Sequence, residues 1–589
     1  MSNELKSTLI WLLGSAITFA LCMKDAAITF AGGDFTPVGP DSFYHAQRIL
    51  GAVSDPGSYY QFDAKIHAPE GSWLTWPWAY DLSVAWLVRS VIALAPELRP
   101  ATVLAYVPPA WAIVNVFLIQ RISSLLHLPL GFQLVAVLCF ASLPLTTNLH
   151  AVGRIDHHFI EHFFTLATLC AGLWWLQETS RVWRGLVLGL IVGFAPAFHT
   201  SLVILQIPIS IAFFLTWSKG EEISRRSVLF FTAGVGFGVL GAVLPSGPFW
   251  DGQFSFYTLS GFHLYASFAN TAFLACLCRL PRTFKGFSLL IGIVALLVGP
   301  IAIPALESVS WFAQKYSYLD EIMELRPWFG MKDSPFIAIL AMYSGLLVLL
   351  PVTLCVMVWR MLVTDDLARR FFYVFSVFGI AFMTNQVHFH YFGSFALYLP
   401  LLLALAAWRS VPGTDPRYVW SLASVALILA FWPVVRGHLN PPKFPMDMNY
   451  YVTRDLYPRL KQACEVKPGV VLASLRDGHY IRYHTNCSVI ANLMIVTPRH
   501  NQKVQLADQL LEKTPGYIRD HELWIDYVLV TKSNNPYATA DAPTSRQLSH
   551  GLPFHLLKRE NEFPQGYRLL SETTHSDGNP VGRAFQITR

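Results

Sequence analysis

Residues 286–306 read GFSLLIGIVALLVGPIAIPAL, a run without an ionisable side chain. Such a run is long enough to cross the roughly 30 Å hydrocarbon core of a bilayer as a helix. The 589-residue chain as a whole shares this character, because 53% of its residues are hydrophobic and only 14% are charged. A soluble protein of this composition would expose large apolar patches, and a disordered one would lack so much apolar surface. We therefore predict a polytopic α-helical membrane protein.

Runs of the same kind recur along the first three quarters of the chain and predict about thirteen spans. They lie near 7–23, 101–120, 129–147, 159–177, 185–200, 201–217, 227–246, 266–281, 286–306, 335–359, 371–386, 389–407 and 418–435. Lysine and arginine gather in alternate loops, so the positive-inside rule places the N-terminus in the cytoplasm. The odd number of spans puts residues after 435 outside, together with the loops 24–100, 148–158 and 307–334. Residues 83–96 are short and contain Arg89, which favours an interfacial helix over a span.

The region 436–589 differs in character from the membrane region 1–435 and predicts a soluble mixed α/β domain on the outer side. Strand-like runs at 470–473 and 527–531 and a helix-like run at 501–512 support this interpretation. Cys464 and Cys487 would pair as a disulfide in an oxidising compartment; the alternative is two unpaired thiols. The net charge of +6 is spread out without a basic block, which argues against nucleic acid as a partner.

Three acidic motifs fall in the predicted outer loops. The sequence reads DSFYHAQR at 41–48, GRIDHHFIE at 153–161 and IMELRP at 322–327, with the carboxylates Asp41, Asp156 and Glu324. Each has a simpler interpretation alone, since Asp41 and Asp156 could cap helices and Glu324 could be a solvated loop residue. Because all three are expected on one face of the membrane beside His and Arg side chains, together they indicate a functional site.

The chemistry of these motifs is typical of a divalent cation site. Mg²⁺ and Mn²⁺ prefer carboxylate oxygens together with substrate phosphate, and His158 is a candidate additional ligand. Bidentate guanidinium groups next to the carboxylates could cradle a donor phosphate; they belong to Arg48, Arg154 and Arg326. If residues 159–169 are helical, His158, Glu161 and His162 share one face. Alternatively, Glu161 and His162 pair with each other inside the bundle.

With these motifs the chain resembles the catalytic subunit of oligosaccharyltransferase, a GT-C membrane glycosyltransferase family that uses polyprenyl-diphosphate-linked donors. It looks like a divergent bacterial-type member. The family has the same arrangement of spans, a large first outer loop and a soluble C-terminal domain. The resemblance implies that Asp41, Asp156 and Glu324 are the catalytic metal ligands and that the cofactor is Mg²⁺ or Mn²⁺.

Two departures from the family concern its substrates. Where the family carries Trp-Trp-Asp-Tyr-Gly for acceptor recognition, residues 471–481 read VLASLRDGHYI. The candidate acceptor-binding residues are therefore Arg476, Asp477, Gly478 and His479. Where the family places an arginine near the donor diphosphate, this chain has imidazoles, and His loses its charge near neutral pH. The candidate donor-binding residues there are His388, His390 and Tyr391.

These observations predict an inverting, metal-dependent glycosyltransferase. It would move a sugar or oligosaccharide from a polyprenyl-phosphate or -diphosphate donor to an extracytoplasmic acceptor. The acceptor could be a protein side chain, as in protein glycosylation, or a lipid-linked glycan or surface polysaccharide. A non-catalytic glycan-binding subunit and a transporter are the alternatives. We expect a single-subunit, multi-pass protein of the inner (cytoplasmic) membrane with its C-terminal domain in the periplasm.

Overall fold

The structure is a computed structural model that describes residues 3–33, 35–221, 223–313, 339–340, 342–439, 450, 453–494, 497–531, 551–558, 563–574 and 580–589. Within this part of the chain, nine helical stretches are long and apolar enough to cross a membrane. They are Glu4–Thr29, Pro100–Leu125, His158–Leu176, Thr200–Lys219, Arg225–Val243, Phe284–Pro304, Gly345–Val363, Leu367–Asn385 and Val387–Arg409. The predicted polytopic helical fold is confirmed.

The remaining expected spans are also helical but do not all meet the length of a crossing helix. They correspond to α6 (Leu130–Ser142) with α7 (Pro144–Leu149), to α9 (Val182–Phe194), to α13 (Gly261–Leu277) and to α20 (Pro416–Leu439). The count of thirteen spans therefore stays a prediction. Residues 307–313, expected at the start of the loop 307–334, belong to helix α14 (Phe284–Ala313), and residues 314–334 lie outside the described residues.

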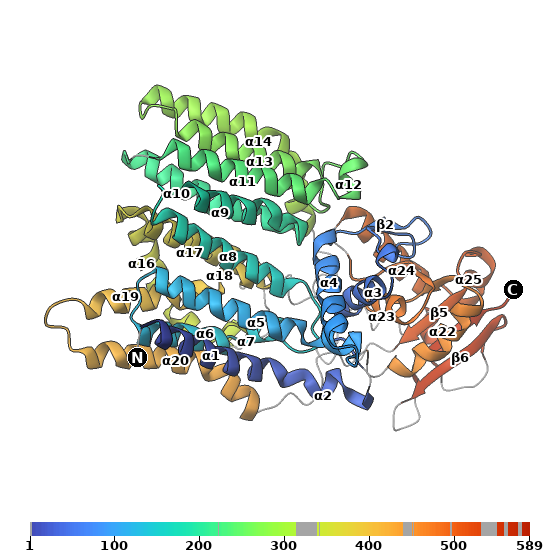
Figure 1. The fold of residues 1–589 in the computed structure, drawn as a ribbon. Helices are drawn as coiled ribbons and strands as arrows, with labels where there is room; N and C mark the ends of the chain where they lie inside the picture. Colours follow the sequence, from blue (N-terminus) through green and yellow to red (C-terminus); the bar gives the residue numbers. More distant parts are fainter. Residues whose placement is uncertain are drawn as a thin grey trace.

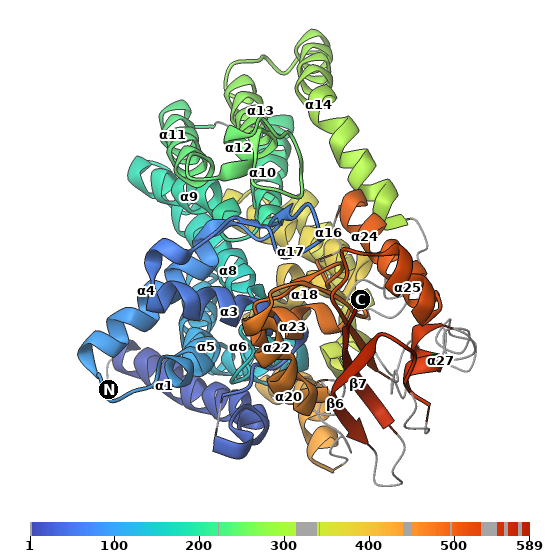
Figure 2. The ribbon, with the colours of Figure 1, turned by 90° about the vertical axis from the view of Figure 1, so that its right-hand side faces the viewer.

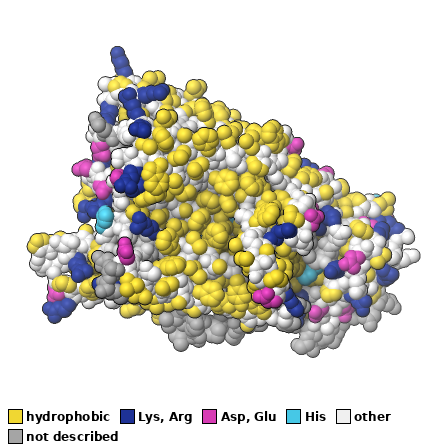
Figure 3. All heavy atoms as spheres, viewed as in Figure 1, with side chains coloured by type: hydrophobic (Ala, Val, Ile, Leu, Met, Phe, Trp, Pro, Cys, Tyr) yellow, Lys and Arg dark blue, Asp and Glu magenta, His cyan; other side chains and the backbone are white. Residues whose placement is uncertain are grey.

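The apolar helices lie side by side as a bundle, and α4 (Trp78–Leu94) runs transverse to them at the end that carries the C-terminal region (Figure 1). This orientation agrees with the interfacial helix expected over 83–96. The side of the bundle seen in Figure 3 is covered by hydrophobic side chains, and Lys and Arg gather at the end away from the C-terminal region. Apolar flanks and charged ends are the pattern expected of a protein that crosses a bilayer.

The C-terminal region contains a five-stranded mixed sheet in the order β4-β3-β5-β7-β6. β3 (Val470–Leu472) pairs in parallel with β4 (Ser488–Val489) and β5 (Tyr527–Thr531), whereas β7 (Pro580–Ile587) is antiparallel to β5 and β6 (Tyr567–Thr574). Helices pack around this sheet: α22 (Tyr457–Val466), α23 (Asp477–His484), α24 (Pro498–Leu511), α25 (Pro515–His521) and α27 (Leu552–Leu556). The predicted α/β character and both expected strands are confirmed. Cys464 and Cys487 form a disulfide.

The first outer loop docks directly on this sheet. Val489 of β4 donates its N–H to the carbonyl of Lys65 and accepts from the N–H of Ala68, so the loop extends the sheet edge. α3 (Pro40–Ser54) of the same loop packs against α23, and Phe43 lies in one apolar cluster with Tyr480. Figure 2 shows α3 and α23 together at the end of the bundle. This contact brings residues of the outer loop and of the C-terminal region to one place.

Candidate functional site

The loop before α8 (His158–Leu176) holds the second acidic motif in a fixed position. Gly153 adopts φ +80°, and a Cβ there would lie 2.4 Å from the Thr29 hydroxyl oxygen, so only glycine fits. Its N–H donates to the carbonyl of Ala105 in α5 (Pro100–Leu125), and its own carbonyl accepts from Val38, just before α3. The turn is thus tied to α5 and to the segment that precedes α3, and Asp156 follows it at the mouth of the bundle.

Three histidines and two carboxylates surround this turn at hydrogen-bonding distance. The His157 Nδ1 lies 3.1 Å from Asp156 Oδ1, and the His158 Nε2 lies 3.4 Å from Asp156 Oδ2. Glu161 accepts from His158 Nδ1 and from His199 Nδ1, both at 2.6 Å. All these side chains except His199 are buried. The arrangement forms one connected network of carboxylates and imidazoles.

His45 joins this network from α3. Its Nε2 lies 3.1 Å from His157 Nδ1, and its Nδ1 donates to Asp81 Oδ1 at 2.7 Å. Asp81, on α4, is also paired with Arg48, and both side chains are fully buried. Although burial alone would raise the pKa of Asp81, Arg48 and His45 outweigh it and lower that pKa. Asp81 therefore stays ionised and orients the His45 ring.

Asp41 approaches the network from its other side, through the C-terminal region. Its Oδ1 lies 3.4 Å from Nε2 of His479, which is buried at the start of α23. The ring of Trp76 lies between His45, at 4.3 Å, and His479, at 5.9 Å, measured between centroids. The outer loop and the C-terminal region therefore each contribute to the walls of one site.

The protonation states of the loop residues suit a cation. Burial would raise the pKa of Asp156, but the nearby His158 and His157 outweigh this and lower it. Burial and the neighbouring His158 lower the pKa of His157 to about 3. At neutral pH the loop therefore presents an ionised carboxylate beside a neutral imidazole, the forms in which both bind metals. Donor atoms of His45, Asp156 and His157 all lie within 4.8 Å of one another, as do those of His157, His158 and Glu161. The residues present fit a divalent cation.

The structure places the predicted donor-binding residues in different surroundings. His388 and Tyr391 face the ring of His158, with centroid distances of 4.4 and 5.9 Å. Arg154 reaches Gly39, two residues before Asp41, because a Cβ on Gly39 would lie 3.8 Å from its guanidinium. Arg48 is held by Asp81 and by the Tyr59 hydroxyl, which accepts from it at 2.7 Å.

His390 turns away from this group and contacts the backbone carbonyls of Val387 and His388. His162 also leaves the network, since its Nε2 meets the Ser394 hydroxyl at 3.3 Å. The alternative prediction, in which His162 pairs with Glu161 inside the bundle, is therefore wrong. Glu324 and Arg326 lie outside the described residues.

The predicted acceptor residues divide between two environments. Asp477 turns into the C-terminal region, where its Oδ2 accepts from the hydroxyl groups of Ser474 at 2.8 Å and Thr531 at 3.4 Å. Gly478 permits close packing, because a Cβ there would lie 2.3 Å from the carbonyl oxygen of Ala491. His479 instead faces Asp41, and Arg476 is partly exposed at the beginning of α23.

Three side chains of the network were not predicted from the sequence: Asp81, His199 and Trp76. His45 lies inside the first acidic motif but was not singled out either. The signal that could have found His45 is its position four residues after Asp41, on the same helical face. Nothing in the local sequence distinguishes Asp81 or His199, which reach the site only through tertiary packing.

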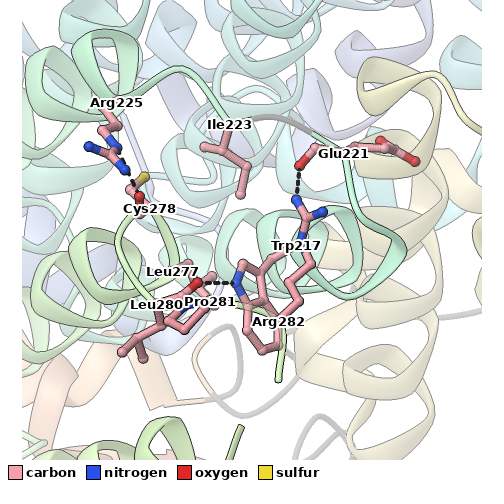
Figure 4. A pocket seen from close by; sticks show the side chains of 9 residues that line it. All are labelled: Trp217, Glu221, Ile223, Arg225, Leu277, Cys278, Leu280, Pro281 and Arg282. Atoms are coloured by element: carbon pink, nitrogen blue, oxygen red, sulfur yellow. Dashed lines mark hydrogen bonds between the residues drawn. The ribbon is translucent and has the colours of Figure 1, made fainter. Parts of the chain in front are cut away.

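A separate cavity of about 520 Å³ lies where α10 (Gln206–Lys219) ends and α11 (Arg225–Val243) begins. Figure 4 shows that Arg282 donates to the carbonyl of Glu221 and Arg225 to that of Cys278. The carboxylate of Glu221 forms a salt bridge with the guanidinium of Arg370, with 2.6 Å between Oε1 and Nη2. This cavity lies at the opposite ends of these helices from the histidine network and shares no residue with it.

Comparison of the sequence with protein-family models and with curated proteins gives no match. Comparison of the structure does. The archaeal oligosaccharyltransferase AglB from Archaeoglobus fulgidus, solved with an inhibitory peptide and a dolichol-phosphate, aligns with 89% of this chain and 69% of its own, at 14% identity and a TM-score of 0.71. This chain has the fold of that solved oligosaccharyltransferase.

Two further solved structures support this assignment of the fold. An Archaeoglobus fulgidus oligosaccharyltransferase in complex with Zn and sulfate aligns with 98% of this chain and 73% of its own, at 13% identity and a TM-score of 0.65. The mycobacterial arabinofuranosyltransferase AftD aligns with 100% of this chain but 42% of its own, at 12% identity and a TM-score of 0.53. The expected resemblance to the oligosaccharyltransferase fold is therefore confirmed at the level of architecture.

Proposed function

We propose that this protein is a metal-dependent GT-C glycosyltransferase that uses a polyprenyl-phosphate or -diphosphate donor. The observation that carries the proposal is the buried network around Asp156, which lies at the mouth of an apolar bundle and beneath a docked C-terminal region. Structurally similar proteins are an oligosaccharyltransferase solved with a dolichol-phosphate and an arabinofuranosyltransferase. A lipid-linked donor would keep its chain in the bilayer and present its phosphate at this mouth.

The side chains of the site have distinct roles in this proposal. Asp156 and His158 would hold the cation, together with Asp41 and Glu324, and the cation would neutralise charge on the phosphate leaving group. His388 and Tyr391 lie beside His158 and would contact the donor phosphate. An acceptor hydroxyl or amide attacks C1 of the sugar as the C1–O bond to phosphate breaks, with inversion. Asp41, with His479 beside it, is the proposed proton acceptor.

We further propose that the acceptor is not recognised in the manner of an Asn-x-Ser/Thr sequon. Aligned without a gap, the Asp of the family's Trp-Trp-Asp-Tyr-Gly falls on Arg476. A one-residue shift would place Asp477 there, but its Oδ2 accepts hydrogen bonds from Ser474 and Thr531. Arg476, which stands in that position without a shift, cannot accept a hydrogen bond from a hydroxyl group. Selectivity for a hydroxyl depends on such a partner. A glycan or another side chain is therefore the proposed acceptor.

The orientation of the chain in the membrane is also a proposal. We propose that the N-terminus is cytoplasmic and that the C-terminal region lies in the periplasm of a bacterial cell. Support comes from the disulfide between Cys464 and Cys487, since disulfides persist in oxidising compartments. The Lys and Arg side chains at the other end of the bundle also support it. The enzyme is proposed to act as a single subunit.

The test uses the purified full chain with a native polyprenyl-linked donor extract. A sequon peptide and lipid-linked glycans are offered in parallel, with and without a chelator. We expect transfer to the glycans, and a loss of about 100-fold or more in Asp156→Ala, comparable to removal of one transition-state stabiliser. Asp55→Ala, an exposed aspartate of the same outer loop, is the control and should retain activity.

Three results would contradict the proposal. Full activity of Asp156→Ala or in excess chelator would exclude the metal-dependent mechanism. Efficient sequon glycosylation that survives Arg476→Ala would exclude the altered acceptor. Absence of transfer to every acceptor, with tight binding of glycan, would favour a non-catalytic glycan-binding subunit.

A further inference from the structure

Three potential ligand atoms from two distant segments of the chain, the helix α3 and the loop before α8, lie close together in the network. The His157 Nδ1 lies 3.1 Å from His45 Nε2 and 3.1 Å from Asp156 Oδ1. Because Asp81 accepts from the Nδ1 of His45, the Nε2 of His45 carries a lone pair. The Nδ1 of His157 is therefore in hydrogen-bonding contact with both other atoms. A divalent cation placed between these atoms, which all lie within 4.8 Å of one another, would have all three as ligands.

Asp81 has the position of an outer-sphere carboxylate. A metal-binding histidine generally donates its second ring N–H to a carboxylate or carbonyl, which sets the tautomer and raises the basicity of the ligating nitrogen. Asp81 does this for His45 at 2.7 Å, and Arg48 holds its other oxygen. An ion pair of Arg48 and Asp81 alone would not need an imidazole whose other nitrogen faces His157 Nδ1. This arrangement is an independent sign that the ring is oriented for a ligand.

We infer that the cation of this enzyme is bound through the nitrogens of His45 and His157 together with the carboxylate of Asp156, and that Asp81 positions His45 for this role. The inference rests on the proposed function for its place in the reaction, and it adds two ligands and one positioning residue. It also changes the expected metal. Imidazole suits Zn²⁺ and the neighbouring transition metals, whereas Mg²⁺ prefers oxygen ligands and retains its water. The site selects a zinc-class cation over Mg²⁺.

The first measurement uses wild-type protein, stripped of metal with a chelator and titrated with Co²⁺ alone. We expect one Co²⁺ to bind per chain with the ligand-field spectrum of nitrogen ligation, and X-ray absorption to show scattering from more than one imidazole, because His158 alone would supply one. Mg²⁺ in large excess should not displace it. A coordination shell with at most one imidazole, or displacement by Mg²⁺ at comparable concentration, would overturn the inference. Neither readout depends on glycosyl transfer.

The second measurement compares variants by their Co²⁺ dissociation constants and spectra. His45→Ala should weaken binding by about 100-fold or more and remove one imidazole from the shell. Asp81→Asn should weaken it by about 10- to 100-fold, the usual cost of losing an outer-sphere partner. The matched control is His162→Ala, because His162 is equally buried but contacts Ser394. Wild-type binding in both His45→Ala and Asp81→Asn would overturn the inference.

The two proposals fail in different ways. If Co²⁺ binds through imidazoles but no acceptor is glycosylated, the proposed function is wrong and the metal site stands. If transfer requires a divalent cation but neither the spectrum nor the affinity involves His45, the proposed function stands and this ligand set is wrong. Where His45→Ala does not yield monodisperse protein, the number of imidazoles in the X-ray absorption of the wild type still decides.

Discussion

At the scale of single residues, Trp76 connects parts of the site that come from distant segments. Its ring lies 4.3 Å from that of His45, 5.8 Å from that of His157 and 5.9 Å from that of His479. These three imidazoles belong to α3, to the loop before α8 and to α23. An aromatic ring that touches all of them restricts their orientations, which a site with fixed ligand geometry requires.

Replacement of Trp76 should therefore impair the site without unfolding the protein. An aromatic contact contributes about 0.5–1.5 kcal/mol beyond its buried area. Because 1.4 kcal/mol corresponds to a factor of ten, we expect Trp76→Ala to lower the rate of glycosyl transfer about tenfold. Trp76→Phe should retain most of the wild-type rate. Trp86→Ala, an exposed tryptophan of α4, is the control. Equal rates for Trp76→Ala and wild type would show that the ring has no positioning role.

At the scale of elements, the bundle depends on close contact between α9 and α11. A Cβ added to Gly189 would lie 2.2 Å from the carbonyl oxygen of Phe231, and one added to Gly234 would lie 2.3 Å from that of Leu186. Gly193 is equally restricted, by the carbonyl of Val235 at 2.5 Å. Small residues spaced four apart let helix backbones approach closely in membranes, where dispersion contacts stabilise association.

This contact predicts opposite effects for two glycines. Gly189→Ala should destabilise the fold by about 1–3 kcal/mol, because the backbone of α11 must shift to admit the methyl group. Gly236→Ala is the matched control, since its added Cβ meets nothing within 4 Å and alanine favours a helix over glycine. Apparent melting temperatures in detergent measure the difference. A melting temperature of Gly189→Ala at or above that of Gly236→Ala would contradict the close approach.

At the scale of the whole molecule, the docking of the first outer loop on the C-terminal region completes the site. The Asp63 carboxylate accepts from the Tyr44 hydroxyl at 2.6 Å and from the Arg482 guanidinium at 3.3 Å. His67 of the loop stacks on His500 of α24, with their ring centroids 4.3 Å apart. Because Asp41 and His479 meet across this contact, its stability should influence activity.

The stacked histidines predict that acid weakens the docking. Burial, Lys503 and Arg499 lower the pKa of His67 to about 4, against the opposing effect of Asp63, and burial lowers that of His500 well below its ordinary value. Unfolded histidine titrates near pH 6.5. Between about pH 6.5 and 4 the separated state therefore binds protons that the docked state does not. The docked state therefore has its full stability relative to the separated state above about pH 6.5, and this stability falls as the pH decreases.

Hydrogen exchange of residues 65–68 and 488–489, corrected for the intrinsic rate at each pH, measures this effect. We expect weaker protection at pH 5 than at pH 7. His500→Gln should reduce the difference between the two pH values, and His521→Gln, an exposed histidine of α25, should leave it unchanged. Protection that does not depend on pH in the wild type would exclude the histidine pair as its cause.

Much of the architecture was determined by local sequence. The length of an apolar run decides whether a helix can cross a bilayer, and no distant residue is needed to count it. The α/β character of the C-terminal region and its strands at 470–472 and 527–531 followed from short-range patterns in the same way. Asp156 and His158 were predicted from the sequence because ionisable side chains at a membrane boundary cost free energy and usually belong to a functional site.

The composition of the site was decided by tertiary structure. His45 meets Asp81 at a separation of 36 residues and His157 at 112, and no periodic pattern in either helix marks these partners. Asp41 meets His479 only because a loop near the N-terminus extends a sheet near the C-terminus. The reason is physical. The hydrophobic pattern that makes a segment a membrane helix or a strand lies within that segment, whereas a buried charge or imidazole is tolerated only where folding supplies its hydrogen-bonding partner. Those partners can be known only once the elements are packed.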